Sequence, residues 1–154
     1  MKRDSKLSGV LHVMLHMAEV GRPVTSETMA KAMQTNPVVI RRIMSGLRNA
    51  GFVRSEKGHG GGWTITRDLA AITLRDVYAA LGSGELFAMG NRTESPGCLV
   101  EQAVNAALNT AFDDAKALLL GRLEAITLAE LSADFHDRMV ASGKSIDLET
   151  VHAA

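Results

Sequence analysis

The chain has very little cysteine: Cys98 is the only one among its 154 residues. A single thiol excludes an intrachain disulfide and any metal site built only from cysteines of one chain. Long apolar runs are missing too, and none approaches the roughly 20 residues that a helix needs to cross a bilayer. The apolar stretch after the basic N-terminus is interrupted by His12, His16 and Glu19, which makes it a poor signal-peptide core. We therefore expect a cytoplasmic protein with no membrane partner.

Residue patterns of catalysis are also absent. The sequence shows no Ser-His-Asp order, no phosphate-binding loop and no carboxylate pair in a plausible cleft, so we assign no catalytic residue. His12 and His16 lie one helical turn apart and can hold a metal together, but two histidines alone are a weak signal. We expect neither a metal nor a cofactor. A small thiol enzyme that uses Cys98 is the enzymatic alternative.

The net charge is zero, yet the charges are unevenly distributed along the chain. Residues 1–67 carry eleven Lys and Arg against four Asp and Glu, a net charge of +7, and the rest of the chain carries −7. A basic first half can bind the phosphates of a nucleic acid while an acidic second half stays away from them. The simpler alternative is a soluble protein with two charged faces.

Apolar spacing predicts two helices in the first 33 residues. Apolar side chains recur at helical intervals over 7–20, and a shorter helix is expected over 27–33. Thr25 or Ser26 can cap this second helix, because either hydroxyl can accept a hydrogen bond from a free backbone N–H group. A short turn then leads to the next element.

The third helix, expected over 37–49, carries a basic face. Asn36 is a good N-cap, and Pro37 stands at the first helical position, where its missing N–H costs nothing. We expect the inner face to bury Val39 or Ile40 together with Ile43, Met44 and Leu47. The outer face presents Val38, Arg41, Arg42, Ser45 and Arg48.

A glycine-rich hairpin follows the basic helix. Short alternating runs over 52–55 and 63–66 predict two strands, and the loop between them holds four glycines and His59. Trp63 is expected to pack beneath this hairpin. A basic helix followed by a flexible basic hairpin is typical of winged helix-turn-helix proteins, whose helix enters the major groove while the wing contacts the neighbouring backbone or minor groove.

The pattern predicts binding of double-stranded operator DNA. Arg41 and Arg42 can form bidentate contacts with guanine, and hydroxyl groups and helix N-termini suit phosphates. His59 can enter a narrow minor groove, contact a phosphate or remain a solvated turn residue. The predicted DNA-binding residues are Thr25, Ser26, Thr35, Asn36, Pro37, Val38, Arg41, Arg42, Ser45, Arg48, Lys57, His59, Gly60 and Gly61.

The second half is expected to be helical and to mediate dimerisation. Thr73 caps a helix over 74–81, a loop fills 82–97, and a helix of some 25 residues starts near Cys98. One face of that long helix is a stripe of apolar, mostly small residues: Val100, Val104, Ala107, Ala111, Ala115 and Leu118. A second copy of the chain is the expected partner of this stripe, and burial against the chain's own head is the alternative. Thr127 opens a short last helix through a capping box.

The expected fold is mostly α-helical with a small β-hairpin wing, a winged helix-turn-helix head followed by a long dimerisation helix. We divide the chain into a DNA-binding domain over 1–81, a loop over 82–97, the dimerisation helix with the final helix over 98–143, and a flexible tail over 144–154.

Cys98 is expected just inside the start of the long helix. The helix dipole and the unpaired N–H groups there favour a thiolate, which would lower the pKa of the thiol and make it reactive, whereas Glu101 acts in the opposite direction. Cys98 is then either a redox switch or an unreactive apolar residue. In the second case we expect the sensor in a ligand pocket between the head and the long helix.

Residues 5–131 resemble the bacterial Rrf2 family of winged-helix transcriptional regulators. The most specific match is the Gly-His-Gly-Gly-Gly-Trp wing over 58–63, which is similar to the family's G-x-G-G-G-aromatic motif, and the segments 47–53 and 72–77 also fit. Members that bind an iron–sulfur cluster carry three cysteines before and at the start of the long helix. Here only the last position is kept, as Cys98, so the resemblance implies the cluster-free branch.

The sequence therefore predicts a homodimeric, sequence-specific repressor that responds to redox conditions through one thiol. Among regulators, the alternative is a cluster or metal sensor in which His12 and Cys98 act together across a dimer. The alternative of another class is a winged-helix module that binds protein and has no role on DNA.

Overall fold

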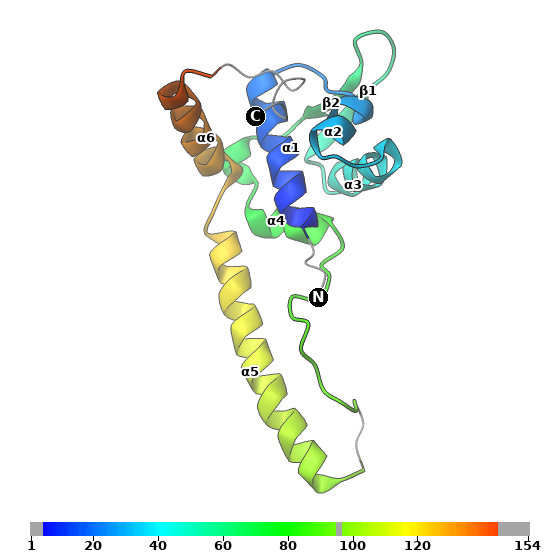
Figure 1. Ribbon diagram of the computed structural model, residues 1–154, viewed down its shortest axis with the longest axis vertical. Helices are drawn as coiled ribbons and strands as arrows, with labels where there is room; N and C mark the ends of the chain where they lie inside the picture. Colours follow the sequence, from blue (N-terminus) through cyan, green and yellow to red (C-terminus); the bar gives the residue numbers. More distant parts are fainter. Residues whose placement is uncertain (1–4, 95–96, 145–154) are drawn as a thin grey trace.

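The computed structural model describes residues 5–94 and 97–144. The elements follow the order α1 (Lys6–Val20), α2 (Ser26–Ala32), α3 (Pro37–Asn49), β1 (Val53–Glu56), β2 (Gly62–Ile65), η1 (Leu69–Ala71), α4 (Leu74–Ala80), α5 (Leu99–Glu124) and α6 (Leu128–Ser142). Helices α1 to α4 and the hairpin form a head, from which α5 extends as a long rod (Figure 1). This is the predicted winged helix-turn-helix with a long C-terminal helix.

The core of the head lies where α1, α2 and α3 meet. Its largest fully buried side chains include the methionines Met14, Met29 and Met44, together with Ile40 and Leu47. Unbranched, flexible methionine side chains suit the irregular space between packed helices. The predicted inner face of α3 is confirmed for Ile40, Met44 and Leu47, whereas Val39 is 42% exposed.

The turn between α2 and α3 is fixed by two side-chain caps. Thr25 caps α2, because its hydroxyl accepts a hydrogen bond from the backbone N–H of Thr28 at 3.1 Å. Asn36 caps α3 as predicted, with its carboxamide oxygen 2.8 Å from the backbone nitrogen of Val38. Pro37 takes the first helical position. These local signals set the start of the helix that carries the basic face.

The hairpin pairs in an antiparallel register in which Ser55 lies opposite Trp63. The strands occupy 53–56 and 62–65, so each prediction was one residue off. The first strand starts late because the backbone N–H of Phe52 donates to the carbonyl of Leu47 at 3.0 Å, as part of the end of α3.

A backbone bridge ties the second strand to the segment before α2. Val24 and Trp63 exchange two hydrogen bonds, of 2.8 and 3.0 Å. Gly62 makes this approach possible, because a Cβ atom there would lie 2.7 Å from the backbone carbonyl of Val24. The wing is therefore attached to the helix-turn-helix by main-chain contacts as well as by the core.

Two capping boxes join the head to the C-terminal half. Thr73 and Asp76 form the capping box of α4, where the sequence predicted Thr73 as the cap. Thr127 and Glu130 form the capping box of α6, as predicted. The two caps lie side by side and form an antiparallel bridge. Leu128, the first residue of α6, is fully buried in the core of the head.

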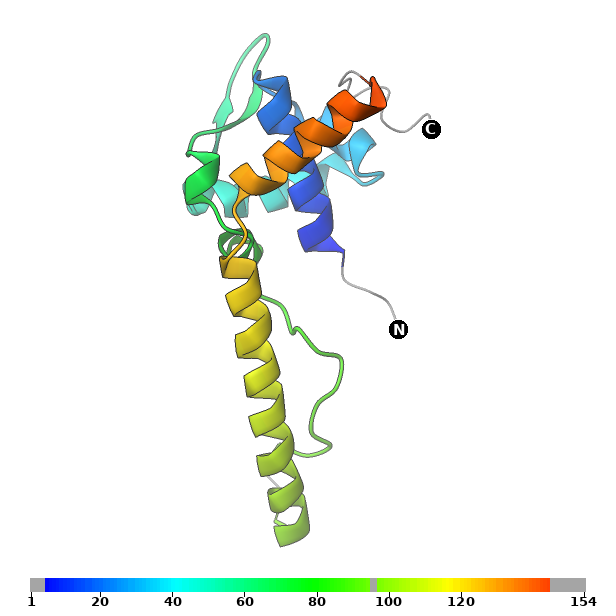
Figure 2. The same cartoon turned by 90° about the vertical axis from the view of Figure 1, so that its left-hand side faces the viewer.

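Helix α6 is longer than the short last helix that the sequence predicted, since it runs for 15 residues and packs back along α1 (Figures 1 and 2). His136 of α6 lies 3.1 Å from the carboxylate of Glu19 on α1, and the ring of Phe135 packs edge-on against His16 at 5.4 Å. Gly143 ends α6 in the left-handed conformation. The tail predicted over 144–154 lies outside the described residues except for Lys144.

We predict that the buried hydrogen bond under the wing stabilises the head. The indole N–H of Trp63 donates to the hydroxyl of Ser26 at 3.0 Å, and both residues are buried. Ser26→Ala leaves that donor without its acceptor and should lower the free energy of unfolding by about 1–3 kcal/mol. Urea titration followed by circular dichroism measures the change.

The control for this prediction is Ser55→Ala, which removes an exposed hydroxyl from the same hairpin and should change stability by less than about 0.5 kcal/mol. Adding Trp63→Phe to Ser26→Ala removes the stranded donor, so the double variant should lose less than the sum of the single losses. Strict additivity would show that the hydrogen bond contributes nothing.

Candidate nucleic-acid interface

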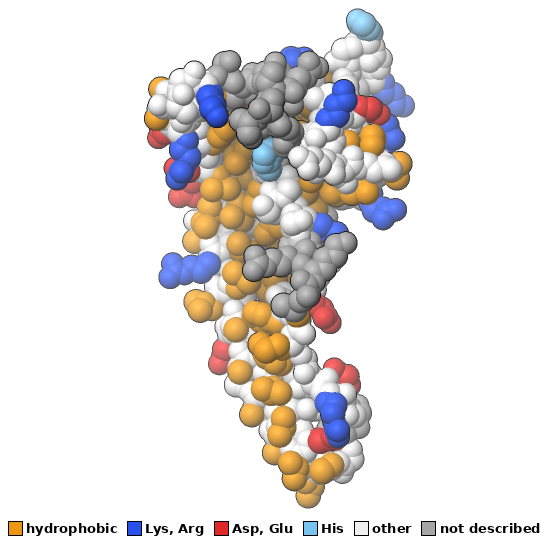
Figure 3. Space-filling view, viewed as in Figure 1, with side chains coloured by type: hydrophobic (Ala, Val, Ile, Leu, Met, Phe, Trp, Pro, Cys, Tyr) orange, Lys and Arg blue, Asp and Glu red, His pale blue; other side chains and the backbone are white. Residues whose placement is uncertain are grey.

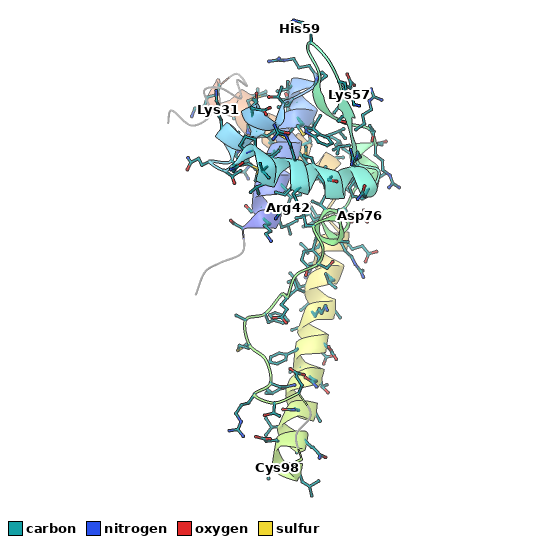
Figure 4. The ribbon with its side chains drawn as sticks, turned by 90° about the vertical axis from the view of Figure 1, so that its right-hand side faces the viewer. Lys31, Arg42, Lys57, His59, Asp76 and Cys98 are labelled. Atoms are coloured by element: carbon teal, nitrogen blue, oxygen red, sulfur yellow. The ribbon has the colours of Figure 1, made fainter. Side chains whose placement is uncertain are left out.

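The outer face of α3 forms a basic surface on the head. Arg41, Arg42 and Arg48 are exposed, Val38 is 57% exposed, and Ser45 is half-buried between them. The sequence predicted this face correctly because Asn36 and Pro37 fix where the helix starts and therefore which residues point inward. Figure 4 shows α3 lying across the front of the head, with Arg42 projecting from it.

The wing stands beside α3 and carries its own basic groups. Lys57 lies on the wing after β1, and His59 lies at its tip (Figure 4). Both are exposed, as is Gly60. Gly61 has a structural role, because a Cβ atom there would lie 2.3 Å from the carbonyl oxygen of Glu56 and prevent the loop from closing. Helix and wing thus present cationic side chains on one surface.

Arg41 is held by an acidic neighbour that sequence reasoning missed. Its guanidinium forms an ion pair with Glu27 in the first turn of α2, and both side chains are more than half exposed. Glu27 also suits the positive end of the α2 dipole. The pair points Arg41 across the turn between the two helices. The single acidic residue at the start of α2 could have suggested this ion pair from the sequence.

The structure corrects the prediction for Ser26. Its side chain is 6% exposed and its hydroxyl is occupied by the indole of Trp63, so this hydroxyl faces the core and is unavailable to a phosphate. Thr25, Thr35 and Asn36 remain on the surface at the N-terminal ends of α2 and α3. Trp63 packs beneath the wing, as expected.

Two further basic residues lie close to this surface and were absent from the predicted set. Lys31 is exposed in the last turn of α2, and Arg54 is exposed on β1. The guanidinium of Arg54 lies 3.0 Å from the carboxylate of Glu56 on the same strand. The alternation of apolar and polar residues along β1 could have predicted from the sequence that Arg54 is exposed.

The predicted stripe on α5 is uncovered within one chain. None of the residues of α5 is buried, and Val100, Val104 and Leu118 are 71%, 49% and 68% exposed. Figure 3 shows apolar atoms continuing down the length of this helix. So much exposed apolar surface on one helix is typical of an interaction site. Burial against the chain's own head, the alternative considered from the sequence, is wrong for these three residues.

Cys98 is the N-cap of α5, one residue outside the helix rather than just inside it. The thiol is exposed, and it lies at the end of the rod away from the head (Figure 4). Backbone N–H groups of Glu101 and Val100 point at the sulfur and lower the pKa of Cys98 below its ordinary value. The carboxylate of Glu101, expected to oppose this effect, is ion-paired with Arg92.

The two histidines of α1 lie one helical turn apart with their rings tilted by 45° to each other. The rings of His12 and His16 lie 4.7 Å apart, and His16 is buried between α1 and α6. Within residues 5–94 and 97–144, no group of three or more His, Cys, Asp or Glu is arranged to hold a metal ion. In the same part of the chain, no helix combines the length and apolarity that crossing a membrane requires.

Comparison with known proteins assigns the family. The model of the Rrf2 family, described as iron-dependent transcriptional regulator, matches residues 3–134. The chain belongs to the Rrf2 family. It is 30% identical over 129 residues to YwnA of Bacillus subtilis (strain 168), a protein named as an HTH-type transcriptional regulator, and the match covers 83% of this chain and 95% of YwnA. The protein is therefore a transcriptional regulator and not an enzyme.

Two solved structures of regulators show the same fold. IscR of T. potens has a TM-score of 0.63 at 19% identity and covers 96% of this chain and 94% of its own. CymR, the global cysteine regulator of B. subtilis, has a TM-score of 0.56 at 23% identity, with 86% and 98% covered.

The residues of this chain do not fit the iron that the family description mentions. Cys98 is the only cysteine of the sequence, and it lies at the end of α5 remote from the head (Figure 4). The described residues bring no second and third ligand to it. No step proposed below passes through iron or an iron–sulfur cluster.

Proposed function

We propose that this Rrf2 family member is a homodimeric repressor that binds double-stranded operator DNA in the cytoplasm and reads sequence with α3. The observation that carries the proposal is the exposed basic face of α3 beside the basic wing. We assign Arg41 and Arg42 to bidentate contacts with guanine in the major groove, for which Arg41 exchanges its ion pair with Glu27 for the base. Thr25, Thr35, Asn36, Ser45, Lys57 and the wing around His59 and Gly60 are assigned to the phosphates and the neighbouring groove.

The proposal assigns dimerisation to α5, whose apolar stripe is exposed within one chain. The apolar stripe needs a partner, and a second copy of the same stripe is complementary to it. Small residues such as Ala107, Ala111 and Ala115 let two helices approach closely. The two heads then bind the half-sites of a near-palindrome about one helical turn of DNA apart.

The recognition helix is tested with an operator that is first selected from random-sequence DNA on the full protein. Arg41→Ala and Arg42→Ala should each weaken operator binding by about 1–3 kcal/mol and relax base preference, if they contact bases. Lys57→Ala should weaken binding to all sequences alike, because it neutralises a phosphate. Fluorescence anisotropy at several salt concentrations measures both effects.

Arg138→Ala is the matched control, since Arg138 is exposed on α6 and pairs with Asp134 away from this surface. It should leave DNA binding unchanged. Unaltered operator affinity in the Arg41→Ala/Arg42→Ala double variant would exclude α3 as the reading helix. Wild-type protein that binds no DNA at any salt concentration would favour the protein-interaction module instead.

The dimer seam is tested with Ala111→Glu, which places a charge in the middle of the stripe, where burial without a partner is costly. Sedimentation should show a monomer, and operator binding should be lost because one head holds only one half-site. Ala106→Glu makes the same substitution about 140° around the helix, at roughly 100° per residue, and should stay a dimer. A tight Ala111→Glu dimer would move the interface elsewhere.

We further propose that oxidation of Cys98 weakens DNA binding. Its exposure and its lowered pKa favour a reactive thiolate. The thiolate attacks one oxygen of a peroxide, the O–O bond breaks, and the sulfur becomes a sulfenic acid while the second oxygen leaves as water or alcohol after protonation. Because the chain holds no second cysteine, a small thiol or Cys98 of a second copy then displaces water from the sulfenic acid to give a mixed disulfide or a Cys98–Cys98 bond across the dimer.

The switch makes two measurable predictions. Alkylation of native Cys98 by iodoacetamide should reach half its maximal rate at a lower pH than in the urea-unfolded protein, because the folded pKa is lowered and the thiolate persists to lower pH. Peroxide should weaken operator binding, and a reductant should restore it. Cys98→Ser should bind DNA and ignore peroxide. Equal loss of binding in Cys98→Ser and wild type would place the sensor elsewhere.

A further inference from the structure

A cavity of about 380 Å³ lies where the head meets the long helix. The first turn of α1, the end of α4, the segment 82–86 and the last turns of α5 form its walls. The apolar part of the lining is Leu7, Leu81, Leu86, Leu119 and Leu123. This volume falls within the range of sites that take small organic molecules.

The cavity uses a different face of α5 from the apolar stripe. The segment after α4 runs along α5 and is fastened there by Asn91, which donates to Asn109 at 2.9 Å, and by Phe87 against Phe112. Figure 2 shows this segment beside the rod. Leu119 and Leu123 continue the same face toward the head, about 100° or more around the helix from Val100 and Leu118. A second copy seated on the stripe therefore leaves the cavity accessible.

Polar groups in the lining come from three elements. Tyr78 of α4 donates its hydroxyl to the carbonyl of Gly84 at 2.5 Å, which fixes one wall. Lys6 brings an ammonium group on the first residue of α1. The first turn of α1 holds no acidic residue, and Ser5 caps it without a side-chain hydrogen bond, so the positive end of the helix dipole adds to Lys6. Glu85 is exposed and is the one carboxylate among the described residues of the lining.

We propose that this cavity binds a small molecule with an apolar body and a single carboxylate, and that its occupancy changes DNA affinity. The apolar body lies among the leucines, and the carboxylate lies at Lys6 and the start of α1. Glu85 selects against a second negative charge. The regulatory part rests on the function proposed above.

Ligand binding and DNA affinity would be coupled because the ligand would contact both the head and the long helix. Leu7 and Leu81 belong to the head, whereas Leu119 and Leu123 belong to α5. A molecule between them favours one angle between head and rod, and in a dimer this angle sets the separation of the two recognition helices. A ligand shifts this equilibrium only as far as it prefers one angle over the other.

Calorimetry on the full protein tests the site with three probes that share one apolar chain: octanoate, octanol and octylammonium. Octanoate should bind, octanol should bind about tenfold more weakly for want of one charge-assisted hydrogen bond, and octylammonium should bind least. Equal or tighter binding of octylammonium would overturn the carboxylate assignment. No binding of any probe would overturn the site.

Substitutions in the lining test whether octanoate binds in the cavity. Lys6→Met should weaken octanoate about tenfold and leave octanol unchanged, whereas Lys116→Met, on α5 outside the lining, should change neither. Glu85→Gln should tighten octanoate. Leu119→Trp fills the cavity and should abolish binding, with circular dichroism confirming the fold. Octanoate binding that survives both Lys6→Met and Leu119→Trp would place the probe elsewhere, for example on the exposed stripe.

DNA binding is measured separately with the selected operator. Octanoate should change the operator affinity of wild type at least severalfold and have no effect on Leu119→Trp. Octanoate that binds wild type without changing its operator affinity would overturn the regulatory role and leave the site standing. Failure of wild type to bind any DNA would refute the proposed function, while calorimetry would still decide the cavity.

Discussion

The position of the long helix depends on one short contact between two helix starts. The backbone N–H of Leu74 donates to the carbonyl of Ile126 at 3.0 Å, and the N–H of Leu128 donates to the carbonyl of Ile72 at 2.8 Å. Ile72 and Leu128 are fully buried on either side of this bridge. The free backbone N–H groups at each helix start are therefore satisfied from two sources: the capping box serves the cap residue and the third helical residue, and the other segment serves the first helical residue. Without this junction, α5 would keep its contacts with α4, such as the ion pair between Arg75 and Glu124, but would lose the backbone bridge that fixes its end.

The junction explains why α5 is a rod and not part of the core. Its C-terminal end is fixed beside α4, where Arg75 lies 2.5 Å from Glu124, and α6 turns back along α1. The rest of the rod points away from the head, and the described segment 84–94 contacts it on one face. The acidic half of the chain is thus held away from the basic surface, which keeps its negative charge from competing with phosphates. The same geometry leaves a second face of the rod for a partner.

Most of the fold was predictable because its signals are local. Asn36, Thr73 and Thr127 cap helices within three residues of themselves, so sequence alone located those helix starts. What failed depends on distant partners. Ser26 looks like a surface hydroxyl until Trp63, 37 residues later, is brought onto it. Glu27 and Arg41 pair across 14 residues, and the docking of Leu128 into the head follows from the junction, which no periodicity reveals. The exposed residues of α3 could be predicted because the N-cap and the helical period fix them. The strand ends could not, because the backbone N–H of Phe52 donates to the carbonyl of Leu47 and so belongs to the turn that follows α3.

The two proposed sensing positions differ in how a signal can reach α3. Cys98 lies at the far end of the rod, where α5 makes its contacts with the segment 84–94 and, in a dimer, with the partner helix. A modification there changes the heads only by altering how the two rods pair, so it requires the dimer. The cavity lies against α1 and α4, and α4 packs on α3 as well as on α5. A ligand there bears on the head directly within one chain. The two sites are therefore physically separable at the level of binding, because a monomeric variant removes the route from Cys98 to the heads and leaves the cavity, its ligand binding and its contacts with the head intact.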